Sequence, residues 1–175
     1  MPLIIPHHGV TPRIAPDAFI AENAVVIGDV EIGAKSSIWY GCVLRGDASS
    51  IAIGKGTNIQ DGTVIHVNSP REGATATSTF IGDNITVGHM ALIHACTLES
   101  GSFVGMKACV MDGVVVEGGA MVAAGALVTP GKRVKKGELW GGSPAKLMRP
   151  LTEKELAYFA YSAPHYVELA ESYRK

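Results

Sequence analysis

Large aliphatic residues recur at every sixth position along most of this chain. From Ile20 to Leu44, every sixth residue is aliphatic. The same register resumes after an insertion at Ile53, after a longer interruption at Ile81, and after a deletion at Val104. All sixteen positions are Ile, Val or Leu: Ile20, Val26, Ile32, Ile38, Leu44, Ile53, Ile59, Ile65, Ile81, Val87, Ile93, Val104, Val110, Val116, Val122 and Val128. The chain is therefore built on a repeat of six residues.

A period of six matches neither the 3.6-residue period of an α-helix nor the two-residue alternation of a sandwich strand. It is typical of short strands joined by tight turns, in which each six-residue unit forms one side of a solenoid. The aliphatic residue then points inward, small residues lie at the corners, and the 21 glycines supply the backbone freedom of the turns. We therefore expect an all-β solenoid, the parallel β-helix of hexapeptide repeats.

Two segments lie outside the repeat. Residues 68–80 are polar, contain Pro and Gly, and predict an excursion loop. From Leu151 the pattern becomes helical, because Thr152 and Glu155 form a capping-box sequence ahead of an apolar stripe. Pro164 is expected to break or kink this helix. The prediction is a β-helix domain over 1–150 and a C-terminal helical segment over 151–175.

Charge and composition narrow the classes of partner. The formal net charge is -1 and charged residues make up only 18% of the chain, so no basic surface predicts binding to nucleic acid or to a membrane. No apolar run approaches the roughly 20 residues of a membrane-spanning helix, and the first residues do not form a signal-peptide pattern. Cys42, Cys96 and Cys109 form no Cys-x-x-Cys pair, which favours reduced thiols. Together these features predict a cytoplasmic protein.

Two of the six histidines occupy the same place in the repeat. His66 follows the inward-facing Ile65, and His94 follows the inward-facing Ile93. They are 28 residues apart, and removing an excursion of about ten residues leaves three units of six. If the solenoid has three sides, the two histidines stack on one face in adjacent coils, where strands lie about 4.8 Å apart. That spacing suits two imidazoles that bind one metal ion.

A third histidine lies on the preceding side of the coil. His89 comes two positions after Val87, so it should point around a corner from His66 and His94. A neighbouring chain could supply it if solenoids pack side by side around a three-fold axis. Three neutral imidazoles with an open fourth position are typical of catalytic Zn²⁺, although Co²⁺ or Fe²⁺ also suits such ligands. The bound dication lowers the pKa of its water to about 7.

Several motifs together resemble the gamma-class carbonic anhydrases. They are the six-residue repeat, Arg45-Gly46-Asp47, Asn58-Ile59-Gln60-Asp61, His66 and Gly88-His89-x4-His94. Gly142-Ser143-Pro144-Ala145-Lys146 is shared more widely with hexapeptide-repeat acyltransferases. The resemblance implies a left-handed β-helix, a homotrimer with zinc sites at its subunit interfaces, and reversible hydration of carbon dioxide to bicarbonate by zinc-bound hydroxide.

The resemblance also implies a role for each motif residue. His66 and His94 resemble the ligands from one subunit and His89 the ligand from the next. Arg45 and Asp61 resemble a salt bridge between subunits, and Gln60 resembles the residue that hydrogen-bonds the zinc-bound water or hydroxide. The remaining family positions are Asn58 and Asp47, which resemble polar neighbours of the site, and Tyr166, which resembles a helix tyrosine that reaches the pocket. For Asn58 and Asp47 turn capping is an alternative, and for Tyr166 core packing is an alternative.

One position departs from the family pattern. The best-characterised pattern of the family carries acidic residues near the metal for proton export, one of them soon after the Arg-Gly-Asp motif. In this chain that stretch is Asp47-Ala48-Ser49-Ser50, without a glutamate. Each turnover must release a proton, so this difference affects the rate of that step. Glu72 in the excursion loop and His165 on the C-terminal segment are candidate substitutes.

Two other functions remain open at this point. Acyl transfer from coenzyme A is the commonest chemistry of hexapeptide solenoids, and it needs a histidine base between subunits but no metal. The chain could also be a metal-binding trimer with weak or no catalysis. Metal content and activity on the two substrates distinguish the three.

Overall fold

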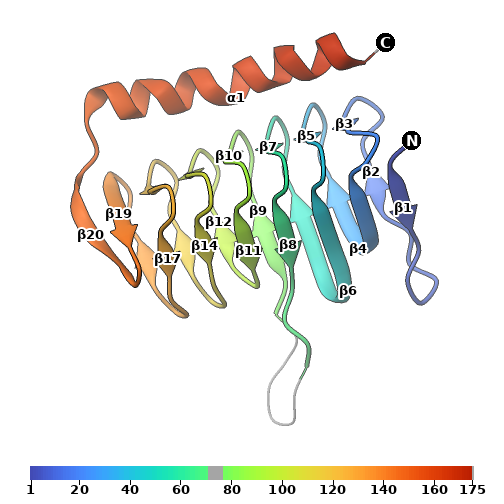
Figure 1. Cartoon of the computed structure of the whole chain (residues 1–175), viewed down its shortest axis with the longest axis horizontal. Coiled ribbons are helices and arrows are strands. Elements are labelled where there is room, and N and C mark those ends of the chain that lie inside the picture. Colours follow the sequence, from blue (N-terminus) through green and yellow to red (C-terminus); the bar gives the residue numbers. More distant parts are fainter. Residues whose placement is uncertain (71–76, 175) are drawn as a thin grey trace.

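The computed structural model describes residues 1–70 and 77–174. The chain winds into a solenoid of short strands, and one long helix lies along its side (Figure 1). The strands are β1 Leu3–Ile5, β2 Arg13–Ile14, β3 Phe19–Ile20, β4 Val25–Ile32, β5 Ser37–Ile38, β6 Val43–Ile53, β7 Asn58–Ile59, β8 Val64–His66, β9 Thr79–Ile81, β10 Thr86–Val87, β11 Leu92–His94, β12 Thr97–Leu98, β13 Phe103–Val104, β14 Cys109–Val110, β15 Val115–Val116, β16 Met121–Val122, β17 Leu127–Val128, β18 Arg133–Val134, β19 Glu138–Gly142 and β20 Ala145–Pro150. The helix is α1, Glu153–Tyr173.

The strands form three faces, as a repeat of three six-residue sides predicts. One face is the sheet β20-β19-β16-β13-β10-β7-β5-β3. The other two faces are β17-β14-β11-β8 and β9-β12-β15-β18. They join through β6, whose residues Val43–Arg45 pair with β8 and whose residues Ile51–Ile53 pair with β9. Neighbouring coils pair in parallel, and the solenoid ends in the antiparallel pair β19–β20.

The aliphatic repeat forms the core. Fifteen of the sixteen repeat positions are buried, and Ile20 is partly buried and packs against them. On one face the register partners from coil to coil are all branched aliphatic residues, which stack along the solenoid axis: Leu44, Ile65, Ile93, Val110 and Val128. Each fully buried aliphatic side chain contributes roughly 1.5–3 kcal/mol. The predicted inward orientation is confirmed.

The helix begins at the predicted cap. Thr152 is the N-cap residue, and its side chain and that of Glu155 satisfy each other's backbone N–H groups in a capping box. Pro164 was expected to break or kink the helix; it lies inside α1, which continues to Tyr173, so it does not break the helix. The ring centroid of Trp39 on the solenoid lies 5.6 Å from that of Tyr166 and 5.3 Å from that of Tyr173, so aromatic packing holds the part of α1 beyond Pro164 against the solenoid.

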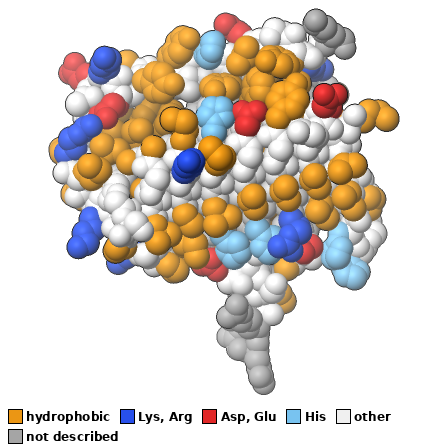
Figure 2. All heavy atoms as spheres, in the orientation of Figure 1, with side chains coloured by type: hydrophobic (Ala, Val, Ile, Leu, Met, Phe, Trp, Pro, Cys, Tyr) orange, Lys and Arg blue, Asp and Glu red, His pale blue; other side chains and the backbone are white. Residues whose placement is uncertain are grey.

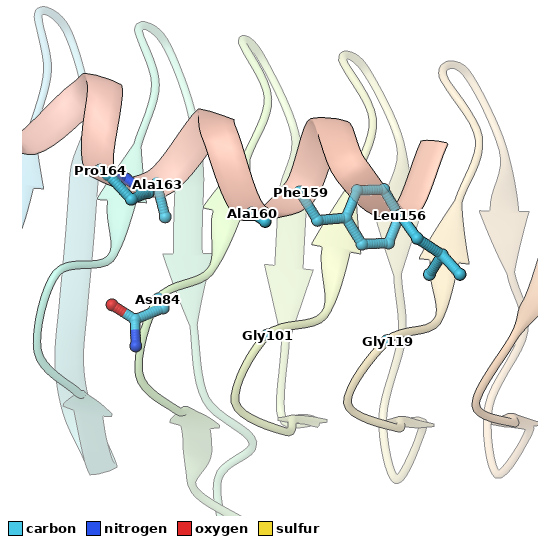
Figure 3. Close-up of a pocket in the computed structure, with 8 residues that line it drawn as sticks. All are labelled: Asn84, Gly101, Gly119, Leu156, Phe159, Ala160, Ala163 and Pro164. Carbon is cyan, nitrogen blue, oxygen red and sulfur yellow. The ribbon is translucent and has the colours of Figure 1, made fainter. Parts of the chain in front are cut away.

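The first half of α1 covers the turns of the later coils. Figure 3 shows Leu156, Phe159 and Ala163 on the side of the helix that faces the turns at Gly101 and Gly119. A groove of about 450 Å³ lies between them. Its lining is mainly apolar and holds no histidine, so it serves helix packing rather than metal chemistry.

The excursion loop is shorter than predicted. Asn68 and Thr77 face each other in an antiparallel bridge with two backbone hydrogen bonds, of 3.0 and 3.3 Å. Thr79 and Phe80, which we expected in the loop, already belong to β9, because Thr79 is buried and pairs with Ile51. The rest of the predicted loop, including Glu72, lies outside the described residues.

Within the described ranges, no helix has both the length and the apolar composition needed to cross a membrane.

Candidate metal centre

Two imidazoles meet on one face of the solenoid. His66 ends β8, His94 ends β11, and the two residues are direct register partners in parallel strands. The Nδ1 atom of His66 lies 3.3 Å from the Nε2 atom of His94, and the ring centroids are 5.3 Å apart. The inward-facing Ile65 and Ile93 are fully buried, and this burial fixes the direction of the histidine that follows each one. The predicted stacking in adjacent coils is confirmed.

A carboxylate sets the tautomer of each ring. His66 Nε2–H donates to Asp47 Oδ1 at 2.9 Å, and His94 Nδ1–H donates to Asp112 Oδ1 at 2.6 Å. Because an ionised carboxylate only accepts, the ring nitrogen beside it carries the proton and the other nitrogen carries a lone pair. His66 Nδ1 and His94 Nε2 therefore direct lone pairs toward each other.

This arrangement fits a metal ion. Two acceptor nitrogens that face each other repel unless a proton or a cation lies between them. Nitrogen ligands of tetrahedral zinc lie 2.0–2.1 Å from the metal, which places two of them about 3.3 Å apart. The spacing of His66 Nδ1 and His94 Nε2 is 3.3 Å.

Asp47 also binds Arg45. The Arg45 guanidinium donates to Asp47 Oδ2, so both carboxylate oxygens have partners. Burial raises the pKa of Asp47, but the hydrogen bonds from His66 and Arg45 and the charge of Arg45 outweigh it and lower that pKa to about 2. Asp47 is thus anionic at neutral pH and keeps the His66 proton on Nε2.

His89 lies on a different side of the coil, as predicted. It follows β10 in the turn before β11, and its Nδ1 is 2.9 Å from Asp61 Oδ2. With the Nδ1 proton on the Asp61 side, Nε2 presents a lone pair. His89 lines a groove of about 350 Å³ together with Gln60 and Tyr166. Among the described residues, no three His, Cys, Asp or Glu side chains form one metal-binding group.

A buried polar chain fixes the amide of Gln60. Gln60 Nε2 donates to Asn58 Oδ1 at 3.1 Å, and Asn58 Nδ2 donates to Thr86 Oγ1 at 2.9 Å. Thr86 Oγ1 in turn lies 2.9 Å from Ser162 Oγ on α1. Gln60 and Asn58 are 5% and 1% exposed. Because the Gln60 nitrogen is engaged, its carbonyl oxygen is the group that can accept a hydrogen bond from a molecule in the groove.

Known proteins resemble this chain in sequence and in fold. The description bacterial transferase hexapeptide (six repeats) matches residues 11–46. Gamma carbonic anhydrase 2, mitochondrial, of Arabidopsis thaliana is 55% identical over 161 residues, which cover 92% of this chain and 58% of that protein. A carbonic anhydrase of Geobacillus kaustophilus is 39% identical over 172 residues, covering 98% of this chain and 91% of that protein. The chain belongs to the gamma-class carbonic anhydrase-like family.

The solved structures agree on the fold of this family member. The crystal structure of a hexapeptide transferase family protein from Anaplasma phagocytophilum superposes with a TM-score of 0.91 at 50% identity and covers 98% of both chains. The match extends over the whole solenoid and confirms the left-handed β-helix of hexapeptide repeats. The chain spans only 58% of the length of the Arabidopsis protein.

The other family positions divide into two groups. Arg45 and Asp47 lie with the histidine pair, whereas Asn58, Gln60 and Tyr166 lie with His89 on the side that α1 covers. Within one chain Arg45 pairs with Asp47, and Asp61 pairs with His89. The salt bridge between Arg45 and Asp61 of different subunits stays a prediction. Tyr166 both lines the groove and packs on Trp39, and burial raises the pKa of its phenol.

Asp112 is a site residue that none of the sequence motifs includes. It lies just beyond β14, on the coil that follows His94, and its carboxylate contacts both His94 and Asn68. The signal that could have found it is an acidic residue one coil away from a histidine, the relation that Asp47 also bears to His66. The candidate substitutes for the proton-exporting acidic residue are Glu72, which lies outside the described residues, and His165. His165 stacks on Tyr161 along α1, with ring centroids 5.2 Å apart.

Proposed function

We propose that the protein is a zinc-dependent carbonic anhydrase that interconverts carbon dioxide and bicarbonate at a site shared between subunits of a homotrimer. The observation that carries the proposal is the pair of facing lone pairs on His66 Nδ1 and His94 Nε2, 3.3 Å apart, which matches two ligands of a tetrahedral zinc ion. The names of the bacterial and plant relatives support it.

His89 of a second copy completes the ligand set. Its Nε2 lone pair faces away from Asp61, and the ring is 39% exposed, so it is available to a neighbouring chain. These three imidazoles would hold a zinc ion, which when bound would supply Lewis-acid chemistry and lower the pKa of a water ligand to about 7. Asp47 and Asp61 hold the protons of their histidines on the nitrogens that face away from the metal.

An apolar stripe beside the histidine pair supports assembly of copies. The stripe consists of register partners whose side chains point outward from one face: Val43, Val64, Leu92, Cys109 and Leu127. Val64 and Leu92 are 38% and 40% exposed in the single chain. Figure 2 shows hydrophobic side chains in a band across this side of the molecule, next to histidines. A second copy is the occupant that covers the stripe and brings its His89 to the site.

Other residues prepare the groove for a small apolar substrate. The Gln60 carbonyl accepts a hydrogen bond and orients the attacking oxygen toward carbon, and the Asn58–Thr86 chain keeps that carbonyl in place. Phe103, Met106 and Met121 line the same groove and exclude water from the reacting atoms.

Metal content, mass and stopped-flow carbon dioxide hydration test the proposal together. We expect about one zinc per chain, a trimer by sedimentation, and hydration that His94→Ala abolishes. His8→Ala, which removes an exposed histidine near the N-terminus, is the matched control and should keep full activity. A zinc-loaded trimer without hydration activity would disprove the catalytic proposal.

Acyl transfer is the second candidate, since the Anaplasma protein is named as a hexapeptide transferase family member. The same preparation distinguishes it. A metal-free protein that cleaves acetyl-coenzyme A and does not hydrate carbon dioxide would favour transfer, with a histidine between subunits as the base.

A further inference from the structure

We propose that Asp112 is a positioning residue that fixes the tautomer and orientation of His94 for metal binding, and that Asn68 keeps Asp112 in place. The inference rests on the proposed role of His94 as a ligand. It adds a residue that the family motifs of this sequence do not include.

Both oxygens of the Asp112 carboxylate are engaged. Oδ1 accepts from His94 Nδ1–H at 2.6 Å, and Oδ2 accepts from Asn68 Nδ2–H at 2.7 Å. A carboxylate with two such partners cannot rotate about its terminal bond without losing both hydrogen bonds. The short distance to His94 is typical of a charge-assisted hydrogen bond, and the two side chains are only 25% and 31% exposed.

The backbone on each side of this contact is also fixed. The Gly131 N–H donates to the Asp112 carbonyl at 2.9 Å, which ties the Asp112 turn to the next coil. Asn68 is paired with Thr77 through two backbone hydrogen bonds at the base of the excursion loop. His94, Asp112 and Asn68 therefore link three coils of the solenoid, and the first of them presents its Nε2 lone pair to His66.

Such a contact matters for affinity more than for folding. A carboxylate that accepts the distal N–H of a ligating imidazole keeps the proton off the metal-facing nitrogen and makes that nitrogen more basic. Losing a contact of this kind weakens metal binding by roughly 10–100-fold. Asp47 bears the same relation to His66, but it is shared with Arg45, whereas Asp112 binds neutral Asn68.

The test compares Asp112→Ala with Asp112→Asn, which keeps an acceptor oxygen without the charge. Zinc affinity is measured with Zn²⁺ alone in competition with a chromophoric chelator. The His94 tautomer is measured in metal-free protein by long-range proton–nitrogen correlation spectra. Asp29→Asn is the matched control, because Asp29 pairs with Arg13 on an exposed edge of the solenoid.

In the wild type we expect the Nδ1–H tautomer at His94. Asp112→Ala should mix the two tautomers and weaken zinc binding by roughly 10–100-fold. Asp112→Asn should keep the wild-type tautomer, and its zinc affinity should lie between those of the wild type and Asp112→Ala. Circular dichroism and the oligomeric state should not change, and Asp29→Asn should match the wild type.

The outcomes separate this inference from the proposed function. If Asp112→Ala keeps both the tautomer and the zinc affinity of the wild type, the inference is wrong even where the wild type hydrates carbon dioxide. If the wild-type trimer shows no hydration but Asp112→Ala still shifts tautomer and affinity, Asp112 positions His94 and the catalytic proposal fails.

Discussion

His66 and His94 are 28 residues apart in the chain, yet they are direct partners in adjacent parallel strands, with ring nitrogens 3.3 Å apart. The repeat produces this contact because each coil returns the chain to the same face one strand spacing further along. A histidine at one repeat position is thus paired with whatever occupies that position a coil later. In the proposed site this geometry supplies two ligands from one chain, and the third has to come from another copy.

Mixed trimers test whether the third ligand comes from another copy. Neither His89→Ala nor His94→Ala should hydrate carbon dioxide alone, since each removes one ligand from every site. Unfolding the two variants together and refolding an equal mixture should restore about a quarter of wild-type activity. One interface in four then joins an intact His66–His94 pair to an intact His89.

The control for this experiment is an equal mixture of His66→Ala and His94→Ala. Both variants lose the pair and keep His89, so their mixed trimers should stay inactive. Activity in the control mixture, or none in the first mixture despite subunit exchange shown by mass spectrometry, would contradict a shared site.

Adjacent residues of β9 should differ sharply in their effect on stability. Ile81 is fully buried and pairs with Ile53 and Leu98, so Ile81→Ala should lower the free energy of unfolding by about 2–5 kcal/mol. Phe80 is 50% exposed on the opposite side of the strand, and Phe80→Ala should change the free energy of unfolding by no more than about 0.5 kcal/mol. Urea unfolding followed by circular dichroism measures both variants. Equal losses would mean that the repeat does not set the direction of the side chains.

The repeat made the core and the histidine pair predictable, because a fixed period converts sequence distance into position on a face. Asp112 escaped prediction because it lies outside the aliphatic repeat positions and the motifs, and the period alone does not show that its side chain meets His94 on the neighbouring coil. The sequence left open whether Pro164 breaks or kinks the helix, since the packing of Tyr166 and Tyr173 on Trp39 depends on solenoid residues that local sequence does not reveal. Side-chain contacts between coils and tertiary packing are the parts that a period of six cannot encode.

The Cys42 thiol should be unreactive in the folded protein. Cys42 is fully buried, and burial raises the pKa of its thiol to about 12, so almost none is thiolate at neutral pH. Iodoacetamide at pH 7.5 (about one unit below the ordinary thiol pKa) should leave Cys42 unmodified in native protein. Complete labelling in urea is the control. Peptide mass spectrometry measures the modified fraction, and fast native labelling of Cys42 would show that the coil opens locally.

Glu155 should make the helix cap depend on pH. Hydrogen bonds from Arg149 and from the backbone and side chain of Thr152, together with the charge of Arg149, hold the pKa of Glu155 well below its ordinary range. A carboxyl whose pKa is lowered by folding stabilises the folded state fully above its unfolded pKa of about 4.3. That contribution is lost as the pH falls from the unfolded pKa through the folded pKa of Glu155.

Glu155→Gln should therefore lower the urea midpoint at pH 7, and its deficit relative to the wild type should shrink toward pH 2 to 3 (roughly two units below the unfolded pKa). Glu153→Gln, in the same first turn, is the matched control, since the capping box uses Glu155. A Glu155→Gln deficit of the same size at both pH values would mean that the loss does not depend on the charge of Glu155, and that the ion pair with Arg149 at 2.8 Å contributes nothing.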